Sequence, residues 1–102
     1  MQGQGIPPGA ISADHFALGR AARELRARRS MSQEYLGLVS GMHRNQIGAI
    51  ERGEQNPTFW TLLNLTSGLR VPLSELVLVY ERNVGEMSVR GATPDRGAQV
   101  PG

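Results

Sequence analysis

The sequence predicts an all-α fold: a compact domain of five short helices between flexible N- and C-terminal tails. Three observations predict this fold. Apolar residues recur at helical spacing between about residues 14 and 82, good capping residues stand where those stretches begin, and glycines stand where two of them end. The length of 102 residues fits one domain, and 39% apolar residues allow a modest core.

The composition excludes several kinds of site. The chain has no Cys, which rules out disulfides and thiolate metal sites, and its two isolated His residues cannot bind a metal alone. We therefore expect no metal and no cofactor. No apolar run reaches the roughly 18 residues of a membrane span, and the first residues lack a signal-peptide pattern, so a cytoplasmic protein is expected. The net charge of +2 is weak evidence for nucleic acid, although all 11 basic residues are Arg.

The N-terminal part predicts an arm and a first helix. Residues 1–13 are Gly, Pro and small polar residues, and are expected to form a disordered arm. Asp14 is expected to cap a helix that runs to about Arg29. The apolar stripe of this helix consists of Leu18, Ala22 and Leu25. Arg26 lies at the edge of that stripe, where a partly buried guanidinium needs a carboxylate partner.

Residues 32–53 predict two short helices joined by a tight turn at Ser40-Gly41. Ser32 is a good N-cap for the first helix. Gly53 can take the left-handed conformation in which helices often end, so it is expected to stop the second helix. Two such helices form a helix-turn-helix, a motif whose second helix can enter the major groove of DNA.

The second helix of this motif is expected to begin near His43. The apolar residues expected to face inward in the motif are Leu36, Val39, Ile47 and Ile50. The outward positions of the second helix are Arg44, Asn45, Gly48 and Ala49. Arg and Asn side chains can bind the edges of guanine and adenine through paired hydrogen bonds, and small neighbours allow close approach. The outward face therefore predicts base contacts.

The next helix, over about residues 59–69, is expected to begin after its cap, Thr58. Its wide apolar face indicates a central position in the core, and consists of Phe59, Leu62, Leu63, Leu65, Thr66 and Leu69. Trp60, the single Trp, lies on the outer side of this helix. It is either partly buried under the C-terminal segment or a contact for another protein, since aromatic residues concentrate at interfaces.

Pro72 begins the last helix, which is expected to turn Leu73, Leu76 and Val77 inward. The run 76–80 is more apolar than a terminal helix needs, and its β-branched residues could end in extended structure. Residues 83–102 are expected to form a flexible tail, with a short strand over 87–90 as an alternative. The helical domain is therefore expected to span 14–82.

Several short motifs with fixed separation carry a resemblance to a known family. They include Ser-Gln-Glu at 32–34, the sequence Ile-Glu-Arg-Gly at 50–53, and Asn-Pro-Thr at 56–58. Together with the apolar positions from about 15 to 80, this pattern resembles the Cro/phage-repressor type of helix-turn-helix protein, also called the xenobiotic-response-element family. The resemblance implies a lambda-repressor-like DNA-binding domain.

The resemblance also implies roles for individual residues. The positions that contact DNA phosphates in this family are occupied here by Gln33, His43, Arg52 and Asn56. Gln33 is also expected to brace Arg44, which falls with Asn45 and Ala49 on the base-reading positions.

Arg26 and Glu51 match a family pair that forms a salt bridge between the first helix and the end of the recognition helix. This pair would orient that helix. Two glycines depart from the family pattern. Gly37 stands where Ala is usual, and Gly48 lies inside the recognition helix, where it either permits close approach to DNA or is merely tolerated. Each glycine is expected to cost about 1 kcal/mol of helix stability relative to Ala.

These residues predict a transcriptional regulator, in the first instance a repressor, that binds double-stranded DNA with the helix over about 43–52 in the major groove. One such module offers little contact area, so we expect a homodimer on a palindromic operator, with half-sites roughly 34 Å apart. The dimer-interface candidates are Leu76, Leu78, Val79, Tyr80 and, more weakly, Trp60. No small-molecule ligand is evident.

The alternative function is an antitoxin or a protein-interaction adaptor of the same fold. Few apolar residues lie in the two tails, which disfavours this function because antitoxins often bind their partners through a tail. An enzyme is not expected, because the sequence has no nucleophile–base arrangement, no phosphate-cradling glycine loop and no metal cluster.

Overall fold

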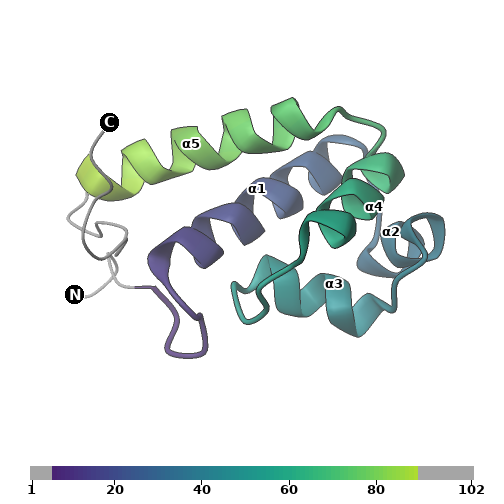
Figure 1. Cartoon of the computed structure of the whole chain (residues 1–102), viewed down its shortest axis with the longest axis horizontal. Coiled ribbons are helices and arrows are strands. Elements are labelled where there is room, and N and C mark those ends of the chain that lie inside the picture. Colours follow the sequence, from purple (N-terminus) through teal and green to yellow (C-terminus); the bar gives the residue numbers. More distant parts are fainter. Residues whose placement is uncertain (1–5, 90–102) are drawn as a thin grey trace.

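The computed structural model describes residues 6–89, and this part of the chain is all α-helical, as predicted (Figure 1). The helices are α1 (Ala13–Arg28), α2 (Gln33–Ser40), α3 (Arg44–Glu51), α4 (Phe59–Leu69) and α5 (Leu73–Val89). No single helix in the described range is long and apolar enough to cross a membrane. Helices α4 and α5 meet that test only as a pair, bent by 100°.

The helices enclose one small core. Helices α1 and α5 pack side by side and run antiparallel, while α2 and α3 pack against each other and contact α4 and α1 respectively (Figure 1). The large side chains with almost no exposure are Leu25 of α1 together with Leu36, Ile47, Ile50, Leu65, Leu69 and Leu76 of the other helices. Small residues of α1, such as Ala17 and Ala21, are also fully buried. They allow the other helices to approach α1 closely.

The N-terminal segment differs from the prediction. The cap of α1 is Ser12, whose Oγ accepts a hydrogen bond from the backbone N–H of His15 at 3.1 Å. Asp14 lies inside the first turn and accepts a hydrogen bond from the Tyr80 hydroxyl at 2.5 Å. The backbone N–H of Ile11 donates to the carbonyl of Gly53 at 2.8 Å. Residues 6–13 are therefore ordered, and the prediction of a disordered arm is wrong for them. Residues 1–5 of the predicted arm lie outside the described range.

The C-terminal boundary also differs. Helix α5 continues through Val89, so the predicted boundary at residue 82, an extended end to the run 76–80, and a strand over 87–89 are all wrong. The Asn83 side-chain amide donates to the carbonyl of Ala17 at 3.1 Å. This contact with α1 helps to hold the helical conformation of a segment whose own helix propensity is low, because tertiary packing overrides propensity. Residues 90–102 of the predicted tail lie outside the described range.

Several apolar side chains point in other directions than predicted. Phe59, Val39 and Val77 were expected to face inward, but they are 65%, 41% and 40% exposed. Leu76 and Val79 were expected at a dimer interface, but they are 0% and 3% exposed and belong to the core of a single chain. The reason is the rotation of each helix about its axis. In α5 the buried stripe runs through positions 76 and 79, which turns its neighbours outward.

Candidate nucleic-acid interface

Helices α2 and α3 form the predicted helix-turn-helix. Ser32 caps α2 by accepting a hydrogen bond from the N–H of Tyr35 at 2.9 Å. Helix α2 ends in the left-handed residue Gly41 (φ 71°), and α3 is followed by Gly53 (φ 75°), as predicted. Both glycines occupy a conformation that residues with a Cβ rarely adopt, so they set the two points at which the chain changes direction.

Gly37 allows the turn to pack tightly on α2. A Cβ atom at this position would lie 2.5 Å from the carbonyl oxygen of Met42, which belongs to the turn backbone. The N–H of Met42 donates to the carbonyl of Gly37 at 2.8 Å. Gly37 is therefore required by close backbone packing, rather than only lowering the stability of α2. Gly19 serves the same purpose in α1, where a Cβ would collide with the carbonyl oxygens of Ile50 and Glu51.

Arg26 and Glu51 form an ion pair between α1 and the end of α3. The Nε and Nη2 atoms of Arg26 donate to the two carboxylate oxygens of Glu51 at 2.6 and 3.0 Å. Its Nη1 atom donates to the carbonyl of Met31 at 2.8 Å. The side chains are only 16% and 4% exposed. The hydrogen bonds to Glu51 hold the pKa of the Arg26 guanidinium above its ordinary value despite burial, so Arg26 stays positively charged.

Gln33 joins the same carboxylate from α2. Its side-chain amide donates to Glu51 Oε1 at 3.0 Å, so the hydrogen bond of this amide goes to Glu51 and not to Arg44 as expected. Glu51 is thus the common acceptor for side chains from α1 and α2, although it belongs to α3. This arrangement fixes the orientation of α3 relative to the N-terminus of α2.

Gly48 is not available for base contact in this structure. The residue is buried, and a Cβ there would lie 3.0 Å from Arg52 Nη1 and 3.5 Å from Gln33 Oε1. The space beside Gly48 is therefore taken by two of the expected phosphate-binding side chains. The predicted base contact of Gly48 would require these side chains to move. The glycine instead leaves room for Gln33 and Arg52 to lie close to α3.

The other expected base-reading residues lie on the open side of α3. Arg44 and Asn45 are exposed and Ala49 is half-buried. Within residues 6–89, no carboxylate lies within ion-pair distance of the Arg44 guanidinium. Arg44 and Asn45 therefore present hydrogen-bonding groups to solvent from the first turn of a helix whose position is fixed by Glu51.

His43 caps α3 through its ring. The Nδ1 atom accepts a hydrogen bond from the backbone N–H of Asn45 at 3.0 Å. A ring nitrogen that accepts carries no proton, so in the neutral imidazole the proton resides on Nε2. This assignment follows from the hydrogen bond. It leaves an exposed N–H donor at the N-terminus of α3, where helix amides also favour an anion.

Arg52 and Asn56 lie beyond the end of α3 and are both exposed. The Nε atom of Arg52 lies 3.1 Å from a carboxylate oxygen of Glu54. Asn56 lies with Pro57 at the border of an apolar hollow of about 290 Å³ between α1, α4 and α5. Arg52 therefore shares its charge with a neighbouring carboxylate.

The sequence matches the family described as "Helix-turn-helix" over residues 23–76, which is more than half of the chain. The chain belongs to the helix-turn-helix family. This helix-turn-helix protein is 38% identical over 60 residues to the control protein C.SmaI of Serratia marcescens, across 59% of the chain and 71% of that relative. It is 36% identical over 64 residues to the cryptic phage CTXphi transcriptional repressor RstR of Vibrio cholerae, across 63% and 58% of the two chains.

Solved structures agree with this assignment. The restriction-modification controller protein C.AhdI from Aeromonas hydrophila is 38% identical and superposes with a TM-score of 0.62, covering 63% of this chain and 97% of that one. The resemblance to the Cro/phage-repressor type is confirmed. This helix-turn-helix protein is a DNA-binding transcriptional regulator.

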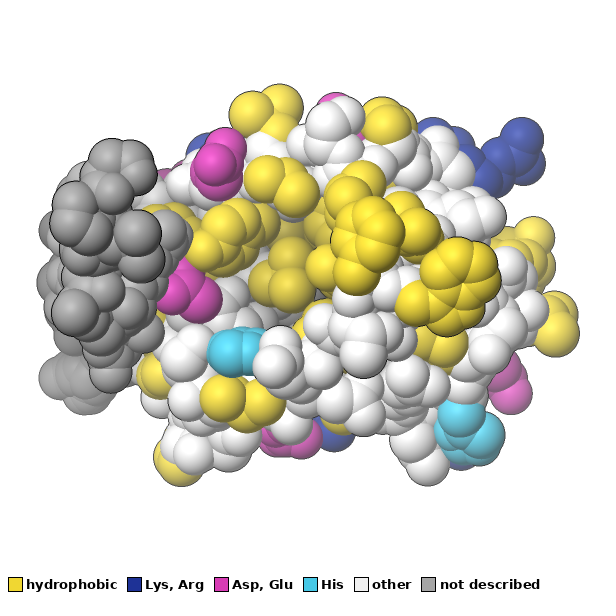
Figure 2. Space-filling view, viewed as in Figure 1, with side chains coloured by type: hydrophobic (Ala, Val, Ile, Leu, Met, Phe, Trp, Pro, Cys, Tyr) yellow, Lys and Arg dark blue, Asp and Glu magenta, His cyan; other side chains and the backbone are white. Residues whose placement is uncertain are grey.

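Sequence reasoning missed two surfaces of this helix-turn-helix regulator. One consists of exposed apolar side chains of α4 and α5, namely Phe59, Trp60, Val77 and Leu78, which are all at least 40% exposed and which we call the apolar patch. Figure 2 shows apolar side chains gathered on one face of the molecule. Trp60 and Leu78 were expected as interface candidates, but Phe59 and Val77 were expected inside, and sequence periodicity places residues on one helix without relating two helices. The other surface is a groove that carries Arg29 and Arg70, residues 41 positions apart in the chain. No local signal in the sequence relates them.

Proposed function

We propose that this regulator binds a palindromic DNA operator as a homodimer, with α3 of each subunit in a major groove. The observation that carries the proposal is the role of Glu51. It receives hydrogen bonds from Arg26 and Gln33 and so fixes α3, while Arg44 and Asn45 at the other end of α3 remain exposed. A fixed helix with free donors and acceptors is what direct base recognition requires.

Arg44 and Asn45 are proposed to recognise bases, with Ala49 making apolar contact beside them. Arg suits the two acceptors of guanine, and Asn suits the donor and acceptor of adenine. Gln33, His43, Arg52 and Asn56 are proposed to bind phosphates on either side of the groove. The Nε2 proton assigned to His43 supports a phosphate contact, because it supplies a donor to an anion without requiring a charged ring.

The dimer is proposed to form through the apolar patch Phe59, Trp60, Val77 and Leu78. Two of the original candidates, Trp60 and Leu78, are 70% and 61% exposed, whereas Leu76 and Val79 are buried within one subunit. Tyr80 is half-buried and its hydroxyl donates to Asp14, so we place it at the edge of the proposed interface and not at its centre. Large exposed apolar side chains that lie together on a small protein mark an interaction surface.

Repression is the regulatory outcome we propose, through a dimer that occupies its operator in the cytoplasm. The support is the relative in Vibrio cholerae, which is a transcriptional repressor.

Fluorescence anisotropy with a duplex selected from random DNA tests the proposal. Arg44→Ala is expected to weaken binding by about 1–3 kcal/mol and to reduce discrimination between bases at one position of each half-site. The matched control is Arg23→Ala, which removes an exposed positive charge from α1. Equal loss in both variants would show that only net charge matters, and wild-type protein without sequence preference at any salt concentration would contradict the proposal.

A further inference from the structure

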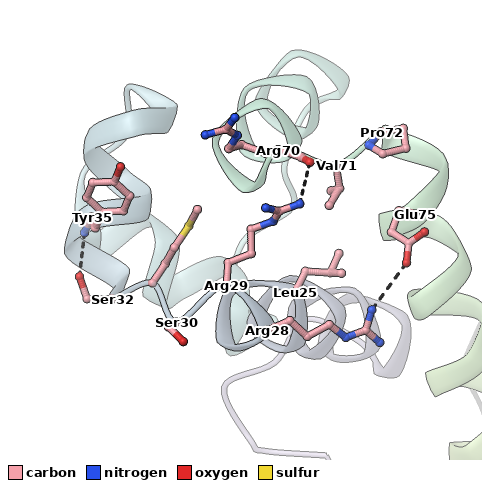
Figure 3. A pocket seen from close by; sticks show the side chains of 11 residues that line it. Leu25, Arg28, Arg29, Ser30, Ser32, Tyr35, Arg70, Val71, Pro72 and Glu75 are labelled. Carbon is pink, nitrogen blue, oxygen red and sulfur yellow. Dashed lines mark hydrogen bonds and ion pairs between the residues drawn. The ribbon is translucent and has the colours of Figure 1, made fainter.

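A groove of about 930 Å³ lies apart from the outward face of α3. The end of α1, the link to α2 and the link between α4 and α5 border it (Figure 3). Apolar residues line part of the groove, namely Leu25, Met31, Val71 and Pro72. The side chains of Arg28, Arg29 and Arg70 also line the groove and bring three guanidinium groups to it. In Figure 1, α3 and the α4–α5 link lie on opposite sides of the molecule.

The groove has an excess of positive charge. Arg28 pairs with Glu24 at 2.6 Å and lies 3.6 Å from Glu75, which is the one carboxylate in the lining. The Arg29 side chain donates to the backbone carbonyl of Arg70 at 3.1 Å, which ties it to the link between α4 and α5 (Figure 3). Within residues 6–89, neither Arg29 nor Arg70 has a carboxylate within ion-pair distance. Two guanidinium groups of the groove lining are therefore uncompensated.

An apolar surface continues from the groove along α2. Tyr35 lines the groove and is 51% exposed, and Leu38 and Val39 on the same helix are 76% and 41% exposed. These side chains lie outside the core cluster, and they are not among the four residues of the patch that we assign to the dimer. An apolar surface beside uncompensated guanidinium groups is typical of a protein-binding site, in which aromatic and Arg residues are enriched.

We propose that this groove and the adjoining face of α2 bind an acidic segment of a second, different protein. Its carboxylates would pair with Arg29 and Arg70, and its apolar side chains would pack against Tyr35 and Leu38. Another copy of this chain does not supply such a segment from its described residues. There, nearly every carboxylate already has a partner, and the remaining Glu34 and Glu81 lie on different helices.

DNA is a poorer fit than an acidic protein segment. Phosphate backbones are recognised by polar and cationic groups, and they leave the apolar side chains of this lining without a partner. The groove also lies away from α3, which is the helix that we place in DNA. The proposal is independent of the proposed operator binding, since it concerns a separate surface and a different class of partner.

The double variant Arg29→Ser/Arg70→Gly removes both uncompensated charges without endangering the fold. Arg70 has φ 61°, a conformation that glycine adopts more readily, and both side chains are exposed. The melting temperature of the double variant should therefore be close to that of the wild type. The matched control is Arg20→Ser/Arg23→Ser, which removes two exposed charges from α1 on another face.

The test selects ligands for the wild-type protein from a displayed library of random peptides of about 16 residues. Enriched peptides should combine Asp or Glu with aromatic or leucine residues. They should bind the groove variant at least about tenfold more weakly than the wild type, and the control variant about as tightly as the wild type. Absence of enrichment, enriched peptides without acidic residues, or equal loss in both variants would overturn the proposal.

A second arm distinguishes DNA as the occupant. The groove variant is titrated with the selected duplex at several salt concentrations. Unchanged affinity and salt dependence support a protein partner. A loss of affinity with a salt slope reduced by about two phosphate contacts would show that Arg29 and Arg70 bind DNA, and would overturn the proposal.

Discussion

Glu51 is the residue on which the geometry of the interface depends most. Its carboxylate is almost fully buried, and it is stabilised by the guanidinium of Arg26 and the amide of Gln33. A buried carboxylate that keeps only one neutral partner would carry a large desolvation cost. The ion pair therefore couples the stability of the domain to the orientation of α3.

Arg26→Ala is expected to lower the free energy of unfolding by about 3–5 kcal/mol, because it leaves the Glu51 charge buried without its cation. Urea denaturation followed by circular dichroism measures this loss. Arg23→Ala on the same helix serves as the control and should change stability by less than about 0.5 kcal/mol, since Arg23 is exposed. A similar stability for the two variants would show that the pair contributes little.

Gly37→Ala is expected to destabilise the domain, although alanine is the better helix former by about 1 kcal/mol. The added Cβ would lie 2.5 Å from the backbone oxygen of Met42, so either α2 or the turn must move. Gly85→Ala is the control, because a Cβ at that position in α5 meets nothing within 4 Å. Gly85→Ala should therefore raise the stability of the domain. If both substitutions raise the denaturation midpoint, the close contact at Gly37 is not restrictive.

At the residue scale, the sequence predicted those features of the structure that depend on local motifs. The glycines that end α2 and follow α3, and the pairing of Arg26 with Glu51, followed from spacing and from the resemblance. The cap of α1 did not, because Ser12 and Asp14 are both good caps and only the packing of residues 6–12 against Gly53 selects Ser12. The role of Gly48 also depends on side chains from elsewhere in the fold, which local sequence does not describe.

At the scale of elements, α1 and α5 are joined by polar contacts as well as by the core. Glu24 of α1 accepts hydrogen bonds from Arg28 on its own helix and from Arg82 on α5. Although burial alone would raise it, these hydrogen bonds hold the pKa of the Glu24 carboxyl below its ordinary value. A depressed carboxyl pKa stabilises the folded state above the unfolded pKa, and this contribution is lost as the pH falls.

Glu24→Gln should therefore reduce stability modestly near neutral pH and have little effect once the pH falls below the lowered pKa of Glu24 in the folded protein. The effect is small because the ion pairs are partly exposed and are screened by salt. Thermal unfolding of both proteins across this pH range measures it. Glu81→Gln, an exposed α5 position, is the control. A stability difference that stays constant as the pH falls would contradict the assigned role.

Helix boundaries show where element-level prediction reached its limit. Periodicity gave the order and approximate positions of all five helices, but the end of α5 was placed too early. Its last turns are rich in Val, Asn and Gly, which favour helix weakly, and contacts with α1 such as that of Asn83 are visible only in three dimensions. The rotation of α4 and α5 was likewise uncertain, which is why Phe59 and Val77 were expected inside.

For the whole molecule, the surfaces fall into three groups: the outward side of α3, the apolar patch of Phe59, Trp60, Val77 and Leu78, and the arginine groove. We assign the first to DNA, the second to a second copy and the third to another protein. A domain with such a small core is only marginally stable alone, so burial of the patch in a dimer would also stabilise each subunit.

Trp60→Ala is expected to raise the dimer dissociation constant at least about tenfold, as an interface aromatic residue does. Sedimentation equilibrium measures the association directly. Ile11→Ala is the control, since this exposed apolar residue lies in the N-terminal segment outside the patch. A wild-type protein that is monomeric at all concentrations, or a Trp60 variant that dimerises normally, would show that the patch is not the dimer interface.

The central claim is that α3 reads DNA through Arg44 and Asn45. Selection of bound sequences from a random duplex library, performed in parallel with wild-type protein and Arg44→Ala, tests it most directly. We expect the wild type to enrich an inverted repeat with half-sites roughly 34 Å apart, and the variant to lose preference at one position in each half-site. Enrichment of the same motif by both proteins, or of no motif by the wild type, would contradict the claim.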